Sequence, residues 1–191
     1  YMAYKVLNNI GLIDTSTNAL TSLKTGLLVI VVNKDTNKDS AFKDLNKVSK
    51  SYISKTITSH LKDSGSSILL PKIDGIEAEN IMLVKGLDAN APMHKWISSY
   101  QAIAKKANSI NAKDLSIMSG AISPSGKDEL WLIEMIAKTV ESNVYIFSET
   151  KNKTAKKPSV KKLTIVTTGL KGADLTKAKA AAKKGYAIGE G

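Results

Sequence analysis

The chain has 191 residues, of which 42% are hydrophobic and 24% are charged, and it contains no cysteine. This composition is typical of a globular domain and argues against a disordered or low-complexity chain. The lack of cysteine excludes disulfides, thiolate nucleophiles and thiolate-bound metal centres. The longest apolar run, residues 26–32, is much shorter than the roughly 20 residues that cross a bilayer. No secretory signal is visible, and we therefore expect a soluble, cytoplasmic protein.

Charge is distributed unevenly along the chain. All 28 basic residues are lysines, and with 17 acidic residues they give a formal net charge of +11. Residues 151–191 contain 11 lysines against Asp174 and Glu190, a net charge of +9, which leaves +2 for residues 1–150. Because arginine is absent, bidentate recognition of guanine, carboxylate or phosphate by guanidinium groups is excluded.

Apolar runs alternate with helical periodicity along the chain, which is the pattern of an α/β domain. The continuous, β-branched run at 26–32 predicts a central strand that is buried on both faces. Apolar residues at spacings of three and four then predict one amphipathic helix over 42–62, with Ser40 as its N-cap.

Two strands are expected next, at 67–71 and 80–85, with a turn at the Asp74-Gly75 dipeptide between them. They are followed by a helix that opens at Pro92 and keeps its apolar residues on one face.

The following region predicts a short strand at 115–118. Residues 125–128 resemble a capping box and predict a helix over about 127–142. Strand character resumes at 144–147.

The end of the chain begins with an exposed loop or linker at 151–162 and a final strand at 163–167. Asp174 is expected to cap a closing helix whose pattern continues to the last residue, so we expect the chain to be part of a longer protein. We accordingly divide the chain into an α/β domain, 1–172, and a closing or linker helix, 173–191, that leads to a further domain.

Titratable residues form no recognisable catalytic set. The two histidines, His60 and His94, have no partner at metal-ligand spacing, and we interpret both as surface residues. The closest carboxylate pairs lie beside a turn and in the first turn of a helix, where acidic residues favour the helix dipole. These pairs are Glu77 with Glu79 and Asp128 with Glu129. No Gly-x-Ser-x-Gly nucleophile elbow occurs, and we predict no catalytic residue and no metal ligand in this chain.

The lysine-rich segment 151–162 is a candidate nucleic-acid contact, because lysine side chains neutralise phosphates without regard to base sequence. No aromatic residue is interleaved to stack bases, and a solvated linker is the alternative interpretation. The candidate contacts are Lys151, Lys153, Lys156, Lys157, Lys161 and Lys162.

A second candidate is the loop from Thr167 to Asp174, which follows a strand and precedes a helix N-terminus. Backbone amides in such a loop can bind an anion. The glycine spacing fits neither a P-loop nor a dinucleotide fingerprint, and a plain turn is the alternative. The candidate anion-binding residues are Gly169, Lys171 and Gly172.

The last third of the chain contains a Tyr-x-Phe segment, a lysine-rich stretch, a basic strand and an Ala-rich helix with a glycine-containing end. Earlier, a Leu-Leu-Pro segment is followed by a second strand and by a helix that carries a tryptophan. The segments are 145–147, 151–153, 161–166, 178–191, 69–75, 80–87 and 96–107. Together they resemble the N-terminal domain of the leucine aminopeptidase (cytosol aminopeptidase) family.

The resemblance implies a three-layer α/β/α fold with a macro-domain-like mixed sheet flanked by helices. Family members are two-domain metallopeptidases that remove N-terminal residues, often leucine, from peptides with a pair of manganese or zinc ions. Their metal ligands belong to the C-terminal catalytic domain, which would begin just past Gly191. The resemblance therefore implies no cofactor and no catalytic or metal-binding residue in this chain.

The partners that the resemblance implies are the chain's own catalytic domain and further copies in a full-length homo-hexamer. DNA is a further partner, because some bacterial relatives bind it, and no membrane partner is expected. Two alternatives stay open: a stand-alone lysine-rich module that binds nucleic acid, and a macro-like module that binds a nucleotide at the loop around Gly169.

Overall fold

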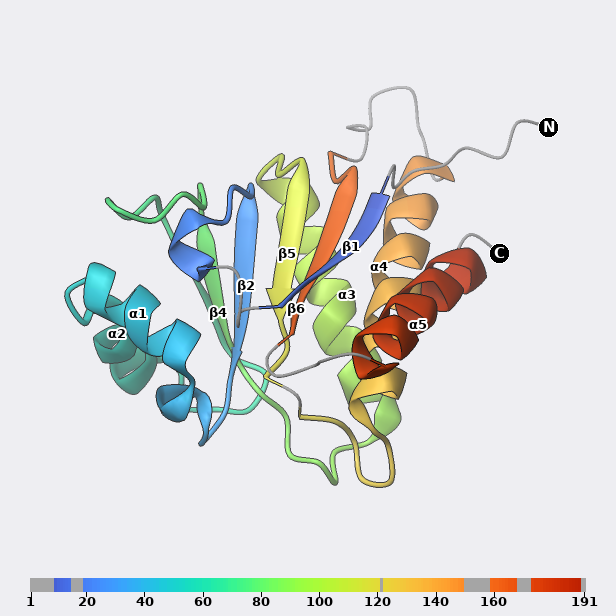
Figure 1. Ribbon diagram of the computed structural model, residues 1–191, viewed down its shortest axis with the longest axis horizontal. Helices are drawn as coiled ribbons and strands as arrows, with labels where there is room; N and C mark the ends of the chain where they lie inside the picture. The colour runs from blue at the N-terminus through green and yellow to red at the C-terminus, as the bar shows by residue number, and fades with distance from the viewer. Residues whose placement is uncertain (1–8, 15–18, 121, 150–158, 168–172, 190–191) are drawn as a thin grey trace.

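The computed structural model describes residues 9–14, 19–120, 122–149, 159–167 and 173–189 (Figure 1). The strands in these ranges are β1 Asn9–Asp14, β2 Leu27–Val32, β3 Ser67–Leu70, β4 Ile81–Lys85, β5 Asp114–Met118 and β6 Lys162–Thr167. The helices are α1 Ser40–Val48, α2 Tyr52–His60, α3 Met93–Ser109, α4 Glu129–Glu149 and α5 Ala173–Gly189, with short 3-10 turns η1 Leu20–Ser22 and η2 Thr36–Lys38. None of the described helices combines the length and the hydropathy of a membrane span.

The described strands form one six-stranded sheet with the order β1-β6-β5-β2-β4-β3. β3 runs antiparallel to β4, whereas the other neighbouring pairs in this sheet are parallel. The helices α3, α4 and α5 cover one face, and α1 and α2 cover the other (Figure 1). This is the three-layer α/β/α arrangement with a mixed sheet that the resemblance implied.

The central strand β2 is buried on both faces, as its continuous apolar run predicts. Leu27 and Val29 pack with side chains of α3 and α4, whereas Leu28 and Ile30 pack with those of α1 and α2. All four side chains are fully buried. Burial of each such side chain stabilises the folded state by roughly 1.5–3 kcal/mol, so β2 is the strand that holds the two outer layers together.

The single helix predicted over 42–62 is wrong, because the chain forms two helices, α1 and α2, with a break between them. Lys50 and Ser51 at the break have left-handed backbone angles, with φ of 55° and 64°. The hydroxyl of Ser49 and the side-chain oxygen of Asn46 accept hydrogen bonds from amides in the first turn of α2, at 3.3 and 3.0 Å. These side chains replace backbone acceptors at the start of α2, and the apolar spacing continues across the break.

Two helix starts also differ from the prediction, and in both an aspartate accepts hydrogen bonds from first-turn amides. Ser40 is the first residue of α1, and the carboxylate of Asp39 accepts from the amides of residues 41 and 42 at 2.8 and 3.2 Å. The α4 helix begins at Glu129, and the Asp128 carboxylate accepts from the amide of Trp131 at 2.8 Å. A carboxylate caps a helix well because it accepts these bonds and complements the dipole.

The strand predicted at 144–147 is wrong, since α4 continues through these residues to Glu149. A four-residue apolar run does not distinguish a strand from a buried helical segment. The predicted strands that correspond to β2, β3, β4, β5 and β6 are confirmed. Asp174 lies in the first turn of α5, which begins at Ala173, so the predicted cap position is also wrong by a small margin.

The last helix, α5, packs along α4 through small residues. Ala178 and Ala182 are buried, and Gly185 lies against the backbone of Glu134. At the edge of this contact, the Nζ atom of Lys184 lies 3.5 Å from the carboxylate of Glu134. The contact places α5 in the same layer as α3 and α4. The division of the chain into an α/β domain and a linker helix after residue 172 stays a prediction.

Candidate functional site

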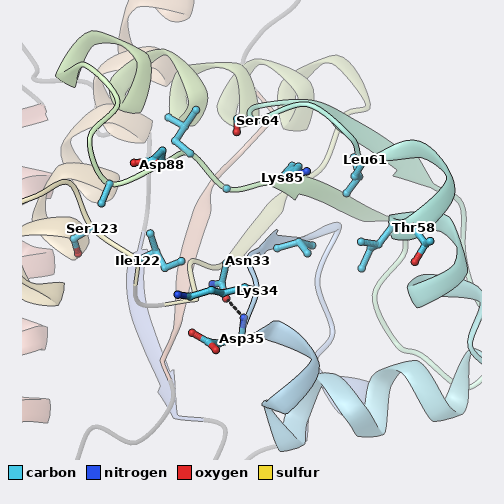
Figure 2. Close-up of a pocket in the computed structure, with 15 residues that line it drawn as sticks. Asn33, Lys34, Asp35, Thr58, Leu61, Ser64, Lys85, Asp88, Ile122 and Ser123 are labelled. Atoms are coloured by element: carbon cyan, nitrogen blue, oxygen red, sulfur yellow. Dashed lines mark hydrogen bonds between the residues drawn. The ribbon is translucent and has the colours of Figure 1, made fainter.

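A crevice with a volume of about 900 Å³ opens at the carboxyl ends of β2 and β4 (Figure 2). The segment after β2 leads to α1 on one face of the sheet, whereas the segments after β4 and β5 lead to α3 and α4 on the opposite face. Ligands of α/β sheets bind where connections diverge in this way at the strand ends. The walls come from residues 32–35, the α2 helix with its following turn, residues 85–89 and residues 122–123.

The loop after β2 is fixed by the side chain of Asn33. The Asn33 Oδ1 accepts a hydrogen bond from the amide of Asp35 at 2.7 Å, and its Nδ2 donates to the carbonyl of Gly120 at 3.4 Å. The hydroxyl of Thr36 accepts from the Asn33 amide at 2.8 Å. These bonds join the ends of β2 and β5 and set the position of Asp35 at the crevice.

The loop after β4 is held from both sides. The amide of Gly86 donates to the carbonyl of Val32 at 2.8 Å, which ties the loop to the end of β2. Ser125 ties it to the loop after β5, because its amide donates to the carbonyl of Ala89 at 2.8 Å and its hydroxyl to Asn90 Oδ1 at 2.9 Å. The crevice is therefore bounded by loops that are hydrogen-bonded to one another.

The charged side chains of the crevice are two lysines and two aspartates, and their formal charges cancel. In Figure 2, Asp35 and Lys34 lie together on the loop after β2, whereas Lys85 at the end of β4 and Asp88 after it lie on the opposite side of the crevice. The Nζ atom of Lys85 donates to the carbonyl of Lys62 at 2.6 Å. Each side of the crevice therefore carries one aspartate and one lysine.

Apolar side chains from four segments line the space between these charged groups. Leu61 is buried, and the others are partly exposed to the crevice. The apolar lining residues are Val32, Ile57, Leu61, Leu87 and Ile122. A concave, largely apolar site with a few polar groups at its ends has the general form of a small-molecule site.

Comparison with known proteins gives no match to any protein-family model. A curated relative, the probable cytosol aminopeptidase of Pseudomonas fluorescens strain SBW25, is 28% identical over 152 residues, which cover 76% of this chain and 30% of that protein. A mutant of tomato leucine aminopeptidase superimposes with a TM-score of 0.65 and 22% identity, over 91% of this chain and 35% of that chain. The chain is similar to the N-terminal domain of the leucine aminopeptidase family. It spans about a third of the length of these two aminopeptidases.

Solved macro domains have a fold similar to that of this chain. The macro domain of ganglioside induced differentiation associated protein 2 has a TM-score of 0.67 and 12% identity, covering 96% of this chain and 87% of that chain. A Trypanosoma brucei macrodomain solved in complex with ADP has a TM-score of 0.62 and 10% identity, covering 94% of this chain and 71% of that chain. At these identities the likeness concerns the fold alone, and it agrees with the macro-domain-like architecture that the sequence implied.

Most of the binding residues predicted from the sequence lie outside the described residues. These are Lys151, Lys153, Lys156 and Lys157 of the lysine cluster, and Gly169, Lys171 and Gly172 of the anion loop. The remaining two, Lys161 and Lys162, are exposed at the start of β6. The amides of both donate to the carbonyl of Lys113, at 2.7 and 3.3 Å, so the start of β6 is tied to the amino end of β5.

The histidines of the domain lie apart from each other and from the crevice lining. His60 is the last residue of α2 and His94 lies in the first turn of α3, and both are exposed. Among the described residues, no group of three or more His, Asp or Glu side chains is arranged to hold a metal ion.

The two carboxylate pairs also occupy separate places. Glu77 and Glu79 line a polar depression of about 610 Å³ that also contains Lys24. At the start of α4, half-burial of Glu129 raises the pKa of its carboxyl group, because desolvation disfavours the charged form.

The sequence analysis did not select the crevice residues. Asn33, Asp35 and Asp88 follow directly after strands that were predicted, and polar residues at the carboxyl ends of parallel strands are the signal that could have found them. That signal needs the strand order, which places the ends of β2, β4 and β5 next to one another.

Proposed function

We propose that this chain is the non-catalytic N-terminal domain of a two-metal leucyl aminopeptidase that removes N-terminal residues from peptides. The observation that carries the proposal is the match to the Pseudomonas fluorescens protein, which covers 76% of this chain but 30% of that protein. Most of the relative's length therefore lies outside the match. We assign catalysis to a further domain, to which the helix at 173–191 leads.

The described residues do not fit a metal centre, since they bring together no group of three or more metal-binding side chains. We therefore assign no ligand of the two divalent ions, manganese or zinc, to this chain. The domain would act in assembly, substrate access or regulation of the full-length enzyme. We expect that enzyme to be a cytoplasmic homo-hexamer.

A peptidase assay tests the non-catalytic role. We expect the 191-residue chain to release no detectable product from leucine p-nitroanilide, with or without added manganese or zinc, because the proposal places the ion pair elsewhere. The matched positive control is a protein in which this chain continues into a catalytic domain. Metal-dependent turnover by the 191-residue chain would contradict the proposal.

The coding sequence beyond codon 191 provides an independent check. The proposal expects the reading frame to continue into a domain with clustered Lys, Asp and Glu metal ligands. A stop codon directly after codon 191 would overturn it.

A second candidate function is nucleic-acid binding, which one feature of α5 favours. The described part of α5 exposes four lysines, while Ala178 and Ala182 are buried. The exposed lysines are Lys177, Lys179, Lys183 and Lys184. A rigid helix that carries a row of ammonium groups can follow a phosphate backbone without reading bases.

Charge removal on α5 tests this second function. Exchanging Lys177, Lys179 and Lys183 for glutamine is expected to weaken binding to a random DNA duplex and to lower the salt dependence of the affinity by about 1 per lysine. The control exchanges three exposed lysines of α1 and α2, on the opposite face, for glutamine: Lys43, Lys47 and Lys55. Equal losses of DNA affinity in the two triple variants would mean that the net charge of the chain, and not the α5 surface, causes the binding.

A further inference from the structure

The crevice lies at the edge of the sheet where α1, α3 and α4 start, after β2, β4 and β5. Helix amino ends at such an edge commonly bind the phosphates of a ligand, and a Trypanosoma brucei macrodomain of similar fold is solved with ADP. We propose that the aspartates beside this crevice exclude nucleoside diphosphates from it. The inference goes beyond the proposed function and does not depend on it.

The amino end of α1 is already bonded to a carboxylate of the chain. Asp39 accepts hydrogen bonds from the amides of Ala41 and Phe42, at 2.8 and 3.2 Å. Asp39 lines a hollow of about 270 Å³ that shares Asn33 and Asp35 with the crevice. A helix amino end binds a phosphate through these first-turn amides and through its dipole, and the Asp39 carboxylate satisfies both.

Aspartates also precede the other two helices. At the start of α4, the Asp128 carboxylate accepts from the amide of Trp131 at 2.8 Å. Asp128 adjoins the crevice, because its carbonyl accepts a hydrogen bond from the hydroxyl of the lining residue Ser123 at 3.1 Å. The loop from β4 to α3 brings the carboxylate of Asp88 to the crevice. Each of the three helix starts is therefore preceded by a negative charge of the chain itself.

The loop amides at the crevice are bonded within the chain as well. After β2, the amides of Asn33 and Asp35 donate to side-chain oxygens of the same loop, at 2.8 and 2.7 Å. After β4, the amide of Gly86 donates to the carbonyl of Val32 and that of Asn90 to a carboxylate, both at 2.8 Å. A loop binds phosphate oxygens through amides that point at the ligand, and these four amides have other acceptors.

The lysines of the crevice do not compensate for this loss of donors. Lys34 lies beside Asp35 and Lys85 near Asp88, so each side carries one charge of either sign (Figure 2). The Nζ atom of Lys85 already donates to the carbonyl of Lys62 at 2.6 Å. The chain contains no arginine, the side chain that binds phosphate bidentately. A diphosphate would bring like charges close to the carboxylates in a partly desolvated site, which is unfavourable.

Isothermal titration calorimetry on the 191-residue chain tests the proposal with ADP-ribose as the probe. We expect no detectable binding by the unmodified chain at millimolar ADP-ribose. Exchange of both Asp39→Gly and Asp128→Gly is expected to create binding at least roughly tenfold tighter than this limit. Glycine is tolerated at the start of a helix, and it frees the first-turn amides while two negative charges are lost. Exchange of the same two residues for asparagine keeps an acceptor for the amides, so this variant is expected to bind at least roughly tenfold more weakly than the glycine variant.

The matched control removes two negative charges elsewhere, with Asp74→Gly and Glu77→Gly, both exposed and outside the crevice. This variant is expected to show no binding, like the unmodified chain, and circular dichroism checks that every variant is folded. Binding of ADP-ribose by the unmodified chain would overturn the proposal. A folded glycine variant that does not bind, or one that binds no better than the control or the asparagine variant, would overturn it as well.

Discussion

Replacing Gly185 with alanine is expected to lower the free energy of unfolding by about 2 kcal/mol. An ideal Cβ atom at this position would collide with the backbone carbonyl oxygen of Glu134 and lie 3.0 Å from the Cβ of Ala137. The carbonyl belongs to α4 and has no rotamer to adopt, so the two helices must move apart and weaken the packing of Ala178 and Ala182. Alanine favours the helical conformation over glycine by about 1 kcal/mol, and the predicted loss is what remains after that gain.

Urea unfolding of the Gly185→Ala chain, followed by circular dichroism, measures this effect. The control is Lys183→Ala, which places alanine on the exposed side of the same helix. That exchange is expected to change the free energy of unfolding by less than about 0.5 kcal/mol. If Gly185→Ala were as stable as the control, the close approach of α5 to α4 would be wrong.

Periodicity was sufficient to predict the elements whose burial follows a regular pattern. The run at 26–32 is apolar at every position because β2 is covered on both faces, and only a central strand has that environment. The α3 helix was predicted for the same reason, since its buried residues, Trp96, Tyr100, Ile103 and Ala107, recur at spacings of three and four.

The elements that were predicted wrongly depend on contacts with segments that are distant in sequence or on single polar side chains. The break between α1 and α2 depends on Asn46 and Ser49, whose side chains bind amides of the next helix while the apolar spacing continues unchanged. The strand β1 was not predicted, because its six residues form a strand by pairing with β6, about 150 residues later in the chain. The run at 144–147 is helical because it continues α4, and its composition alone is equally typical of a strand.

The residues of the crevice could not be selected from the sequence for a similar reason. Asn33 and Asp88 look like ordinary turn residues in the sequence, and the order of the strands places both at the crevice. That order places the end of β2 between those of β4 and β5, which come later in the chain. Sequence reasoning instead selected lysines and glycines by their local density, and most of these lie outside the described residues.

The second large effect is expected at Gly120, where alanine should lower the free energy of unfolding by about 2–3 kcal/mol. Gly120 has a φ of 70°, a left-handed conformation in which a Cβ atom alone costs about 1–2 kcal/mol. The new Cβ would also meet the Nδ2 atom of Asn33 and lie 3.2 Å from the carbonyl oxygen of Val31. Asn33 must then move, and its 2.7 Å bond to the amide of Asp35 is lost.

An alanine exchange at Gly126 separates the cost of the left-handed backbone from the cost of the steric contact. Gly126 has a φ of 80° but no atom within 4 Å of an ideal Cβ. Gly126→Ala should lose only the conformational part, about 1–2 kcal/mol. The difference between the two variants in urea unfolding measures the contact of Gly120 with Asn33. Equal stability losses in the two variants would mean that the close approach of Gly120 to Asn33 does not constrain residue 120. A larger loss at Gly120 would show that the junction of β2 and β5 depends on the close packing of Gly120 against Asn33.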